Sequence, residues 1–372
     1  MNICMEDLLK IAVQQDASDL HITTHVPPRL RVHGDLVSLD YPPLSSSDTK
    51  SLIYSLLTDR QKKHFEEKME LDFSFGFQNL GRFRVNVFMQ KSAVAAAFRR
   101  FLPTALSFSQ LGIPHKLAEL CYLPRGLILV TGPTGSGKST TLACMVEHIN
   151  RERGVHIVTI EDPIEYYFSP KKAIINQREL LVDTLSFPNA LRSVLREDPD
   201  VVLVGEMRDL ETVESTMRVA ETGHLTFSTL HTNSAAETIS RIVDIFPSQY
   251  QTQVRIMLSM ALQAVITQTL LPRTGGNGRV LALEILIPNA AIRNLIREDK
   301  IHQIYSAMQM GQEKFGMLTL NQSLAGLYLQ KAITLETAMN ASSKKDELTD
   351  MIQRGDVSGM SRMSMNQSQA RS

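Results

Sequence analysis

The chain has 372 residues, 43% of them hydrophobic, which is enough for two domains of ordinary size with buried cores. Its charge is balanced at 39 basic and 39 acidic side chains, so the overall charge gives no electrostatic drive toward nucleic acid. The three cysteines stand far apart, which excludes a C-x-x-C pair and favours a reducing compartment. No apolar run approaches the roughly 18 residues of a membrane span, and the N-terminus lacks the basic start of a signal peptide. We expect a soluble, cytoplasmic protein.

Residues 1–100 predict a small mixed α/β domain. Short segments in which apolar and polar residues alternate are typical of half-buried strands, and they are interspersed with amphipathic helical segments. A linker with proline, serine and glycine is expected at 101–112. The expected elements are helices over Met5–Val13 and Ser46–Phe65, and strands over Leu20–Thr24, Pro28–His33, Phe73–Phe77, Arg82–Phe88 and Ala93–Phe98.

Residues 113–341 predict a second α/β domain, in which strands alternate with helices. The strands are continuous apolar runs, as expected of a parallel sheet covered by helices on both faces. From residue 342 to 372 the chain is polar, and we expect a disordered tail. The predicted strands are Leu127–Thr131, Val155–Ile160, Val201–Val204, Leu225–Ser228 and Val280–Leu286, and helices are predicted over Leu142–Ile149, Ala291–Glu298 and Leu318–Leu329.

A glycine-rich segment between the first of these strands and the next helix fits the phosphate-loop pattern G-x-x-x-x-G-K-[ST]. Glycines let successive backbone N–H groups face phosphate oxygens, and the helix N-terminus adds a partial positive charge. We expect Lys138 to reach the β- and γ-phosphates of ATP and Ser139 to bind Mg²⁺. The segment consists of Gly132, Pro133, Thr134, Gly135, Ser136, Gly137, Lys138, Ser139 and Thr140.

Three of the other predicted strands are followed by polar residues that include Glu161, Glu206 and His231. Ligands of open parallel sheets bind beyond the carboxyl ends of the strands, so these side chains are expected near the phosphate loop. Glu206 is suited to hold Mg²⁺ directly or through water, Glu161 to orient or deprotonate water, and His231 to sense the γ-phosphate. Each residue taken alone is also compatible with a cap on the next helix, and either glutamate could be the base.

The arginines of the first domain allow two interpretations. A period of two residues places Arg82, Arg84 and Asn86 on one face of their strand, and Arg99 follows another apolar strand. Guanidinium groups in such a row can bind phosphate as arginine fingers do. The other interpretation is a solvated strand face. His224 precedes its strand rather than following it, and its position alone favours a structural histidine.

Together these motifs resemble the secretion-type ATPases of type IV pilus and type II secretion machines, over Met5 to Ala341. The matching segments are Gly132–Thr140 (Walker A), Thr159–Tyr166 (Asp box), Asp200–Asp209 (Walker B) and Gly223–Ser234 (His box). The resemblance implies a PAS-like first domain, a RecA-like second domain with C-terminal helices, and a homohexamer. It gives His224 a functional role beside His231 and makes Arg84 and Arg99 arginine fingers. Arg196 and Arg208 are implied only as supporting residues.

Two features resemble the pilus-retraction branch of that family. The segment Ala291–Glu298 matches its signature; from the residues alone it is an amphipathic helix with Arg293 and Arg297 on the polar face. The extra N-terminal domain and four-cysteine zinc motif usual in extension and secretion ATPases are not found in this sequence. The resemblance implies a motor for pilus retraction and twitching motility at the cytoplasmic face of the inner membrane. It also implies contacts with a pilus platform protein and, indirectly, pilin, and allows a partner ATPase.

Three other interpretations remain at this point. An extension or secretion motor would share the fold. A slowly hydrolysing regulatory switch would bind nucleotide and act on a partner motor, although the full set of predicted catalytic residues argues against it. A RecA-like nucleic-acid motor would show a DNA-stimulated rate with steep salt dependence.

Overall fold

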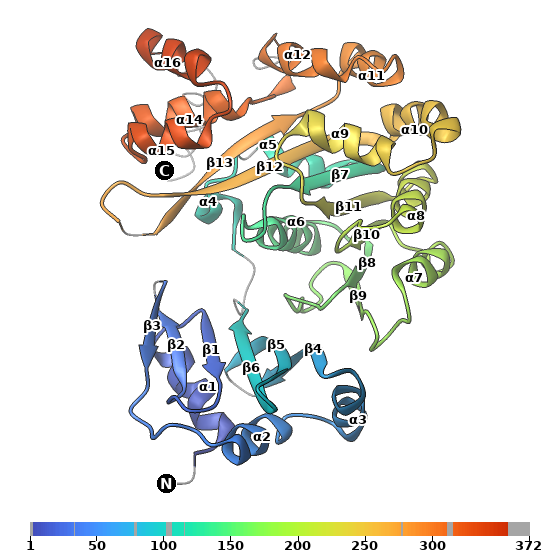
Figure 1. Cartoon of the computed structure of the whole chain (residues 1–372). Helices are drawn as coiled ribbons and strands as arrows, with labels where there is room; N and C mark the ends of the chain where they lie inside the picture. Colours follow the sequence, from blue (N-terminus) through green and yellow to red (C-terminus); the bar gives the residue numbers. More distant parts are fainter. Residues whose placement is uncertain are drawn as a thin grey trace. The chain divides into compact units, whose positions relative to one another are not determined.

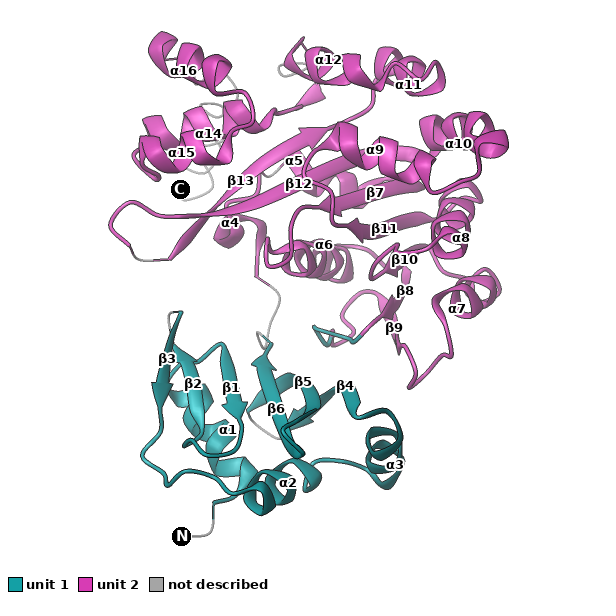
Figure 2. Ribbon diagram, in the orientation of Figure 1, with its two compact units in different colours: residues 1–104, 163–167 teal, residues 105–162, 168–372 magenta. Residues whose placement is uncertain are grey.

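The computed structural model describes residues 3–32, 34–77, 80–101, 106–114, 116–276, 278–310 and 315–355. The chain forms two compact units, which Figure 2 distinguishes by colour. Unit 1 comprises residues 1–104 and the short segment 163–167, and unit 2 comprises the remainder. The break after residue 104 lies inside the predicted linker. No sequence pattern indicates that 163–167 groups with the first unit.

Unit 1 contains a six-stranded antiparallel sheet with the order β3-β2-β1-β6-β5-β4. In β5, Val85 and Val87 are buried, whereas Arg82, Arg84 and Asn86 lie on the opposite face, as their alternation indicates. The buried face packs with the helices into one apolar core. The elements are α1 (Met5–Gln14), β1 (Asp19–Ile22), β2 (Arg29–Val32), β3 (Asp35–Ser38), α2 (Ser46–Tyr54), α3 (Asp59–Lys68), β4 (Glu70–Phe77), β5 (Gly81–Gln90) and β6 (Ala93–Arg100).

One expected helix of unit 1 is two helices in the structure. The segment predicted as Ser46–Phe65 is interrupted between α2 and α3, where Thr58 begins the second helix. Thr58 and Gln61 form a capping box, in which each side chain accepts from the other residue's backbone N–H. That T-x-x-Q spacing is visible in the sequence and is the signal that was missed. The short strand β3 was not predicted either.

Unit 2 contains a seven-stranded sheet with the order β13-β12-β7-β11-β10-β8-β9 (Figure 1). Its strands pair in parallel except β13, which is antiparallel to β12. The four central strands β7, β8, β10 and β11 correspond to predicted apolar runs, and β9 and β12 were not predicted. The strands are β7 (Gly126–Thr131), β8 (His156–Glu161), β9 (Ile174–Glu179), β10 (Val201–Val204), β11 (Leu225–Leu230), β12 (Leu262–Pro272) and β13 (Arg279–Leu286).

Helices cover both faces of this sheet. Side chains of α6 pack on one face, and those of α7 to α11 pack on the other, which gives the two-sided core that continuous apolar strands require. The helical elements are α4 (Phe108–Leu111), α5 (Lys116–Glu119), η1 (Leu120–Tyr122), α6 (Lys138–Glu152), α7 (Phe187–Val194), α8 (Leu210–Glu221), α9 (Ala235–Asp244), α10 (Ser248–Ala261), α11 (Ala290–Arg297), η2 (Ile301–Gln303) and α12 (Ile304–Met310).

The C-terminal helices pack on the end of the β12–β13 hairpin. They are α14 (Leu320–Leu329), α15 (Leu335–Ala341) and α16 (Lys345–Arg354). The expectation of an unpacked tail from residue 342 is wrong for α16, because Leu348 is fully buried in the same cluster as Leu324 of α14. Residues 356–372 of that tail lie outside the described part of the chain. Among the helices described, each is too short or too polar to span a bilayer.

Candidate active site

The predicted phosphate loop connects β7 to α6 in unit 2. Gly132, Gly135 and Gly137 have φ angles of 131°, 79° and 91°, in the region that disfavours residues with a side chain. At Gly132 there is also no space, because a Cβ atom would lie 2.3 Å from the carbonyl oxygen of Gln268 on β12. Gly137 is the N-cap of the 15-residue helix α6. The glycines therefore allow the tight curl that turns backbone N–H groups inward.

Two side chains of this loop fit a phosphate group. Lys138 is buried, and its Nζ donates to the carbonyl oxygens of Gly132 at 2.9 Å and Pro133 at 3.1 Å. Ser136 is also buried, and its hydroxyl has no hydrogen-bond partner within the described chain. A buried cation and an unsatisfied hydroxyl at a helix N-terminus are suited to bind a polyphosphate. Ser139 lies in the same first turn, where magnesium is bound in phosphate-loop proteins.

Glu161 ends β8 at the same edge of the sheet. Its Oε1 accepts hydrogen bonds from the hydroxyl of Thr159 at 2.6 Å and the amide of Gln177 on β9 at 3.3 Å. Gly205, which follows β10, donates its N–H to the Ile160 carbonyl at 2.8 Å. A Cβ atom at Gly205 would be 3.3 Å from the Glu161 Cα, so glycine allows the loop after β10 to pass close to Glu161. The carboxyl ends of β8 and β10 therefore meet here.

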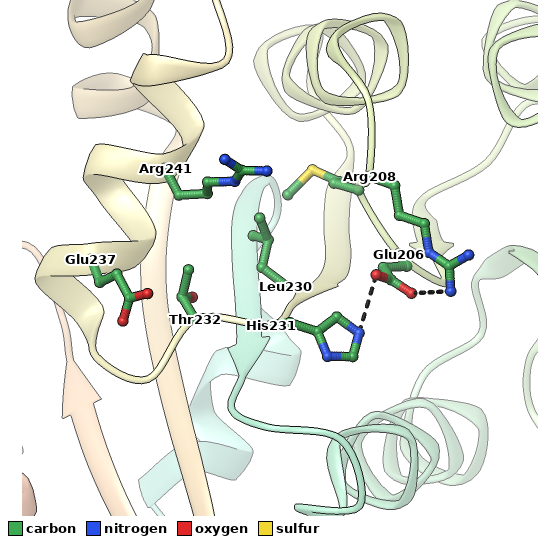
Figure 3. Close-up of a pocket in the computed structure, with 8 residues that line it drawn as sticks. Glu206, Arg208, Leu230, His231, Thr232, Glu237 and Arg241 are labelled. Atoms are coloured by element: carbon green, nitrogen blue, oxygen red, sulfur yellow. Dashed lines mark ion pairs between the residues drawn. The ribbon is translucent and has the colours of Figure 1, made fainter.

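Glu206 follows Gly205 and has a partner at each carboxylate oxygen. Its Oε2 lies 2.9 Å from Nη2 of Arg208, and its Oε1 lies 3.1 Å from Nε2 of His231, as Figure 3 shows. Burial alone would raise the pKa of the Glu206 carboxyl. Arg208 and His231 more than offset this and hold the pKa below its usual value. Glu206 is therefore an ionised carboxylate at neutral pH.

His231 connects this carboxylate to the phosphate loop. Its Nδ1 lies 3.4 Å from the hydroxyl oxygen of Thr134, while its Nε2 faces Glu206. An ionised carboxylate only accepts, so Nε2 carries the proton, and in the neutral ring Nδ1 is left to accept from the Thr134 hydroxyl. The structure thus places Thr134, His231, Glu206 and Arg208 in one chain of contacts. Strands β7, β10 and β11 bring them together because parallel strands end at the same edge.

His224 does not join this group. It precedes β11, and its Nδ1 faces the Val219 carbonyl at 3.1 Å and the Thr222 hydroxyl at 3.3 Å. His231 follows the same strand, and at about 3.3 Å per residue the two histidines lie on the order of 20 Å apart. The structure places His224 at the amino edge of the sheet, away from His231 and the phosphate loop of its own chain. A functional role for His224 stays a prediction.

The predicted fingers lie side by side in unit 1. Arg84 and Arg99 are directly paired across β5 and β6. Arg84 Nε lies 3.2 Å from both carboxylate oxygens of Asp72, and Arg99 Nε lies 3.0 Å from Oδ1 of Asp19. Their side chains are 40% and 66% exposed. Both guanidinium groups are therefore accessible, and each has a carboxylate partner on its own sheet.

Sequence reasoning gave no distinct role to Arg82, which contacts the segment 163–167. Its Nε donates to the Ile164 carbonyl at 2.9 Å, its guanidinium lies 4.1 Å from the ring centre of Tyr167, and it also donates to the Ser74 hydroxyl. The two partners in 163–167 lie about 80 residues away along the chain. The alternation that picked out Arg82 could not identify them.

One arginine on the predicted polar face of helix α11 is not open to solvent. Arg293 donates from Nη1 to the carbonyls of Ser259 at 2.5 Å and Met260 at 3.2 Å, at the end of α10, and from Nη2 to Gln263 at 3.2 Å. Arg293 is therefore on the polar face, as predicted, but it is half-buried against the end of α10 rather than open to solvent. Arg297 is exposed and contacts Asn294 of its own helix, as predicted for a polar face.

Comparison with known proteins identifies the family to which this chain belongs. The sequence pattern of the type II/IV secretion system proteins matches residues 1–355. The chain belongs to that family. It is 52% identical over 332 residues to the type IV pilus retraction ATPase PilT of Pseudomonas aeruginosa, covering 89% of this chain and 96% of the relative. A twitching motility protein of Neisseria gonorrhoeae is 49% identical, with 92% and 91% covered.

Solved structures agree with this grouping. The crystal structure of the pilus retraction motor PilT with bound ADP has 55% sequence identity and a TM-score of 0.88, over 94% of this chain and all of that one. The ATPase DotB of Legionella pneumophila has 27% identity and a TM-score of 0.77, over 90% and 94%. The predicted family, the two-part α/β fold with a RecA-like ATPase domain, and the ATPase activity are confirmed.

Proposed function

We propose that this protein is a motor ATPase that couples ATP hydrolysis to retraction of a type IV pilus, and so to twitching motility. One observation carries the proposal: a phosphate loop and two glutamates meet at one sheet edge in a chain 52% identical to PilT along nearly its whole length. Within a family that also contains secretion proteins, the 52% identity to PilT is higher than the 33–37% identity to type II secretion E proteins.

In this proposal the phosphate loop binds ATP and Mg²⁺. Lys138 exchanges the Gly132 and Pro133 carbonyls for the β- and γ-phosphates, and Ser136 gains an acceptor. Ser139 and Glu206 would hold Mg²⁺, which when bound neutralises charge on the phosphates. No group of three or more His, Cys, Asp or Glu in the described residues is placed to hold a metal alone. Bound nucleotide would therefore supply the remaining ligands.

Of the two glutamates, Glu161 is proposed as the residue that orients or deprotonates the attacking water. Both oxygens of Glu206 already have a cationic or imidazole partner, and its lowered pKa makes it a weaker base. Glu161 ends β8 at the same sheet edge as the phosphate loop, and its contacts with Thr159 and Gln177 help to orient its carboxylate. His231, between Thr134 and Glu206, is placed to respond to the γ-phosphate.

We further propose a homohexamer in which Arg84 and Arg99 act as arginine fingers on nucleotide held mainly by another subunit. Both side chains reach solvent. The Arg84–Asp72 pair is partly exposed on both sides, and such pairs are worth only about 0–1 kcal/mol, so exchanging this carboxylate for a phosphate is inexpensive. Asp19, the partner of Arg99, is buried, so that exchange costs more. The motor would act at the cytoplasmic face of the inner membrane on a pilus platform protein and, indirectly, on pilin. The exposed side of α11, which includes Arg297, is the proposed coupling surface.

The proposal is tested by two variants of the site. Lys138→Ala should weaken nucleotide binding by about 10- to 100-fold, because a charge-assisted contact is lost. Glu206→Gln should keep binding and lose turnover. Glu211→Gln, on the exposed side of α8, is the matched control and should behave as wild type.

ATP turnover and nucleotide affinity are measured in vitro, and pilus number and twitching are measured in cells. Full ATPase activity in either site variant would overturn the assignment. Piliated, non-twitching cells are expected for both; loss of surface pili would instead indicate an extension motor.

A further inference from the structure

A cavity of about 410 Å³ lies next to Glu206, between α9 and the loop that follows β10 (Figure 3). Glu206, Arg208 and His231 line it on one side, and Glu237 and Arg241 line it from α9. Its volume is in the range of small-ligand sites. The cavity thus borders the proposed catalytic residues without being part of the phosphate loop.

The charged groups around this cavity differ in whether they have partners. Arg208 and His231 both contact Glu206. Glu237 accepts the Asn233 N–H at 2.8 Å, in the first turn of α9. Arg241 is exposed to the cavity and makes no hydrogen bond or ion pair with any residue that the structure describes. One guanidinium is therefore available for an anion.

His231 separates the cavity from the phosphate loop. One ring nitrogen contacts Thr134 of the loop, and the other contacts Glu206 of the cavity wall. An anion that passes this ring from the γ-phosphate position enters a space bordered by two arginines and two glutamates, of which Glu206 is paired with Arg208. His231 therefore connects the phosphate loop to the wall of the cavity that Arg241 also lines.

We propose that this cavity is the exit site for inorganic phosphate, with Arg241 as its principal ligand. The inference rests on the proposed ATP hydrolysis. In that reaction water forms a new P–O bond, the bond from the γ-phosphorus to the bridging oxygen breaks, and ADP and phosphate are released; one water proton stays on the phosphate and the other passes through Glu161 to solvent. The phosphate carries a P–OH group, which can donate to the ionised Glu206, while a guanidinium binds its other oxygens in a fork.

The test titrates inorganic phosphate into the full-length protein saturated with ADP and Mg²⁺, and measures affinity by calorimetry. Arg241→Gln should weaken phosphate binding about tenfold or more, and Arg241→Lys should recover part of it. The Kd of ADP should change less than about twofold. Arg218→Gln is the matched control, because Arg218 lies on the exposed side of α8 and is paired with Glu214. Sulfate, which has no proton to donate at neutral pH, should bind several-fold more weakly.

Phosphate affinity unchanged in Arg241→Gln would overturn the proposal, and equal binding of sulfate would overturn its selectivity for the product. A changed oligomeric state with unchanged phosphate affinity would assign Arg241 to a subunit contact instead. The titration needs no turnover, so a protein that binds phosphate at Arg241 but does not hydrolyse ATP would count against the proposed function alone. With turnover, product inhibition by phosphate should weaken by the same factor in Arg241→Gln.

Discussion

The two units hold their charged groups in different ways. In unit 2, Glu206 has a partner at each oxygen and is connected through His231 to the phosphate loop, so the site is one network that is largely formed in a single chain. In unit 1, the exposed Arg99 is paired with the buried Asp19, and Arg84 is paired with the partly exposed Asp72. The proposed site of unit 2 is therefore preorganised, whereas the proposed fingers of unit 1 would have to exchange a carboxylate partner to act on phosphate.

The largest effect on turnover is expected from a change at Glu161, which belongs to the site of unit 2. Glu161→Gln should reduce kcat by about 10²–10⁴ while leaving nucleotide affinity near wild type, because a general base is lost and the phosphate contacts remain. Steady-state turnover and nucleotide titration measure the two quantities. A loss of less than a few-fold, in a protein that still folds and assembles, would move the role of base to Glu206.

The second prediction concerns the arginines of unit 1. Arg99→Ala should lower turnover by about 10- to 100-fold, the equivalent of one lost contact to a charged phosphate. Arg60→Ala, exposed on α3, is the matched control and should be silent. If the fingers act between subunits, mixing Arg99→Ala with Glu161→Gln subunits should restore part of the activity. If the subunits mix and no ATPase activity returns, each catalytic site is formed within one chain.

The two arginines of α11 differ in the same way, because Arg293 is hydrogen-bonded to the end of α10 and Arg297 is exposed. Arg293→Ala should destabilise the protein by about 1–3 kcal/mol, because carbonyls at the end of α10 lose a charged donor. Arg297→Ala should stay within about ±0.5 kcal/mol and keep its turnover in vitro. Urea unfolding measures the difference.

The same α11 pair also tests coupling in cells. Arg297→Ala should leave cells with surface pili and no twitching if the exposed side of α11 couples hydrolysis to the pilus machine. Normal twitching in that variant would argue that α11 serves packing alone, through Ile292 and Ile296.

The part of the site that the sequence predicted follows from the geometry of parallel sheets. Glu161, Glu206 and His231 each follow a buried apolar strand, and such strands end at one edge, so their proximity could be expected. The position of His224 follows from the same rule, because it precedes its strand. Its functional role came only from family resemblance, and the structure does not bring it to the site of its own chain.

The parts that were missed depend on tertiary contacts. Strand β9 is a sheet edge with a mixed polar sequence, so it lacks the continuous apolar run of its neighbours. Helix α16 is polar except for a few residues and is fixed by burial of Leu348. The partners of Arg293 and Arg84 could not be predicted without knowing how the helices pack and how the strands are paired. Only the helix break at Thr58 had a local signal that could have been used.

The smallest effect is expected from removing the carboxylate that holds Arg84. Asp72→Asn should cost no more than about 1 kcal/mol, because the ion pair with Arg84 is exposed to solvent and screened by salt. Turnover should stay at the wild-type level or rise a few-fold, since Arg84 no longer has to leave an ionised partner to reach phosphate. Asp59→Asn, which removes the exposed pair with Lys62, is the control for a general effect of charge. Urea unfolding and steady-state turnover measure the two outcomes. A tenfold loss of activity in Asp72→Asn alone would show that Asp72 orients Arg84 for catalysis, and the arginines of unit 1 would then be as preformed as the site of unit 2.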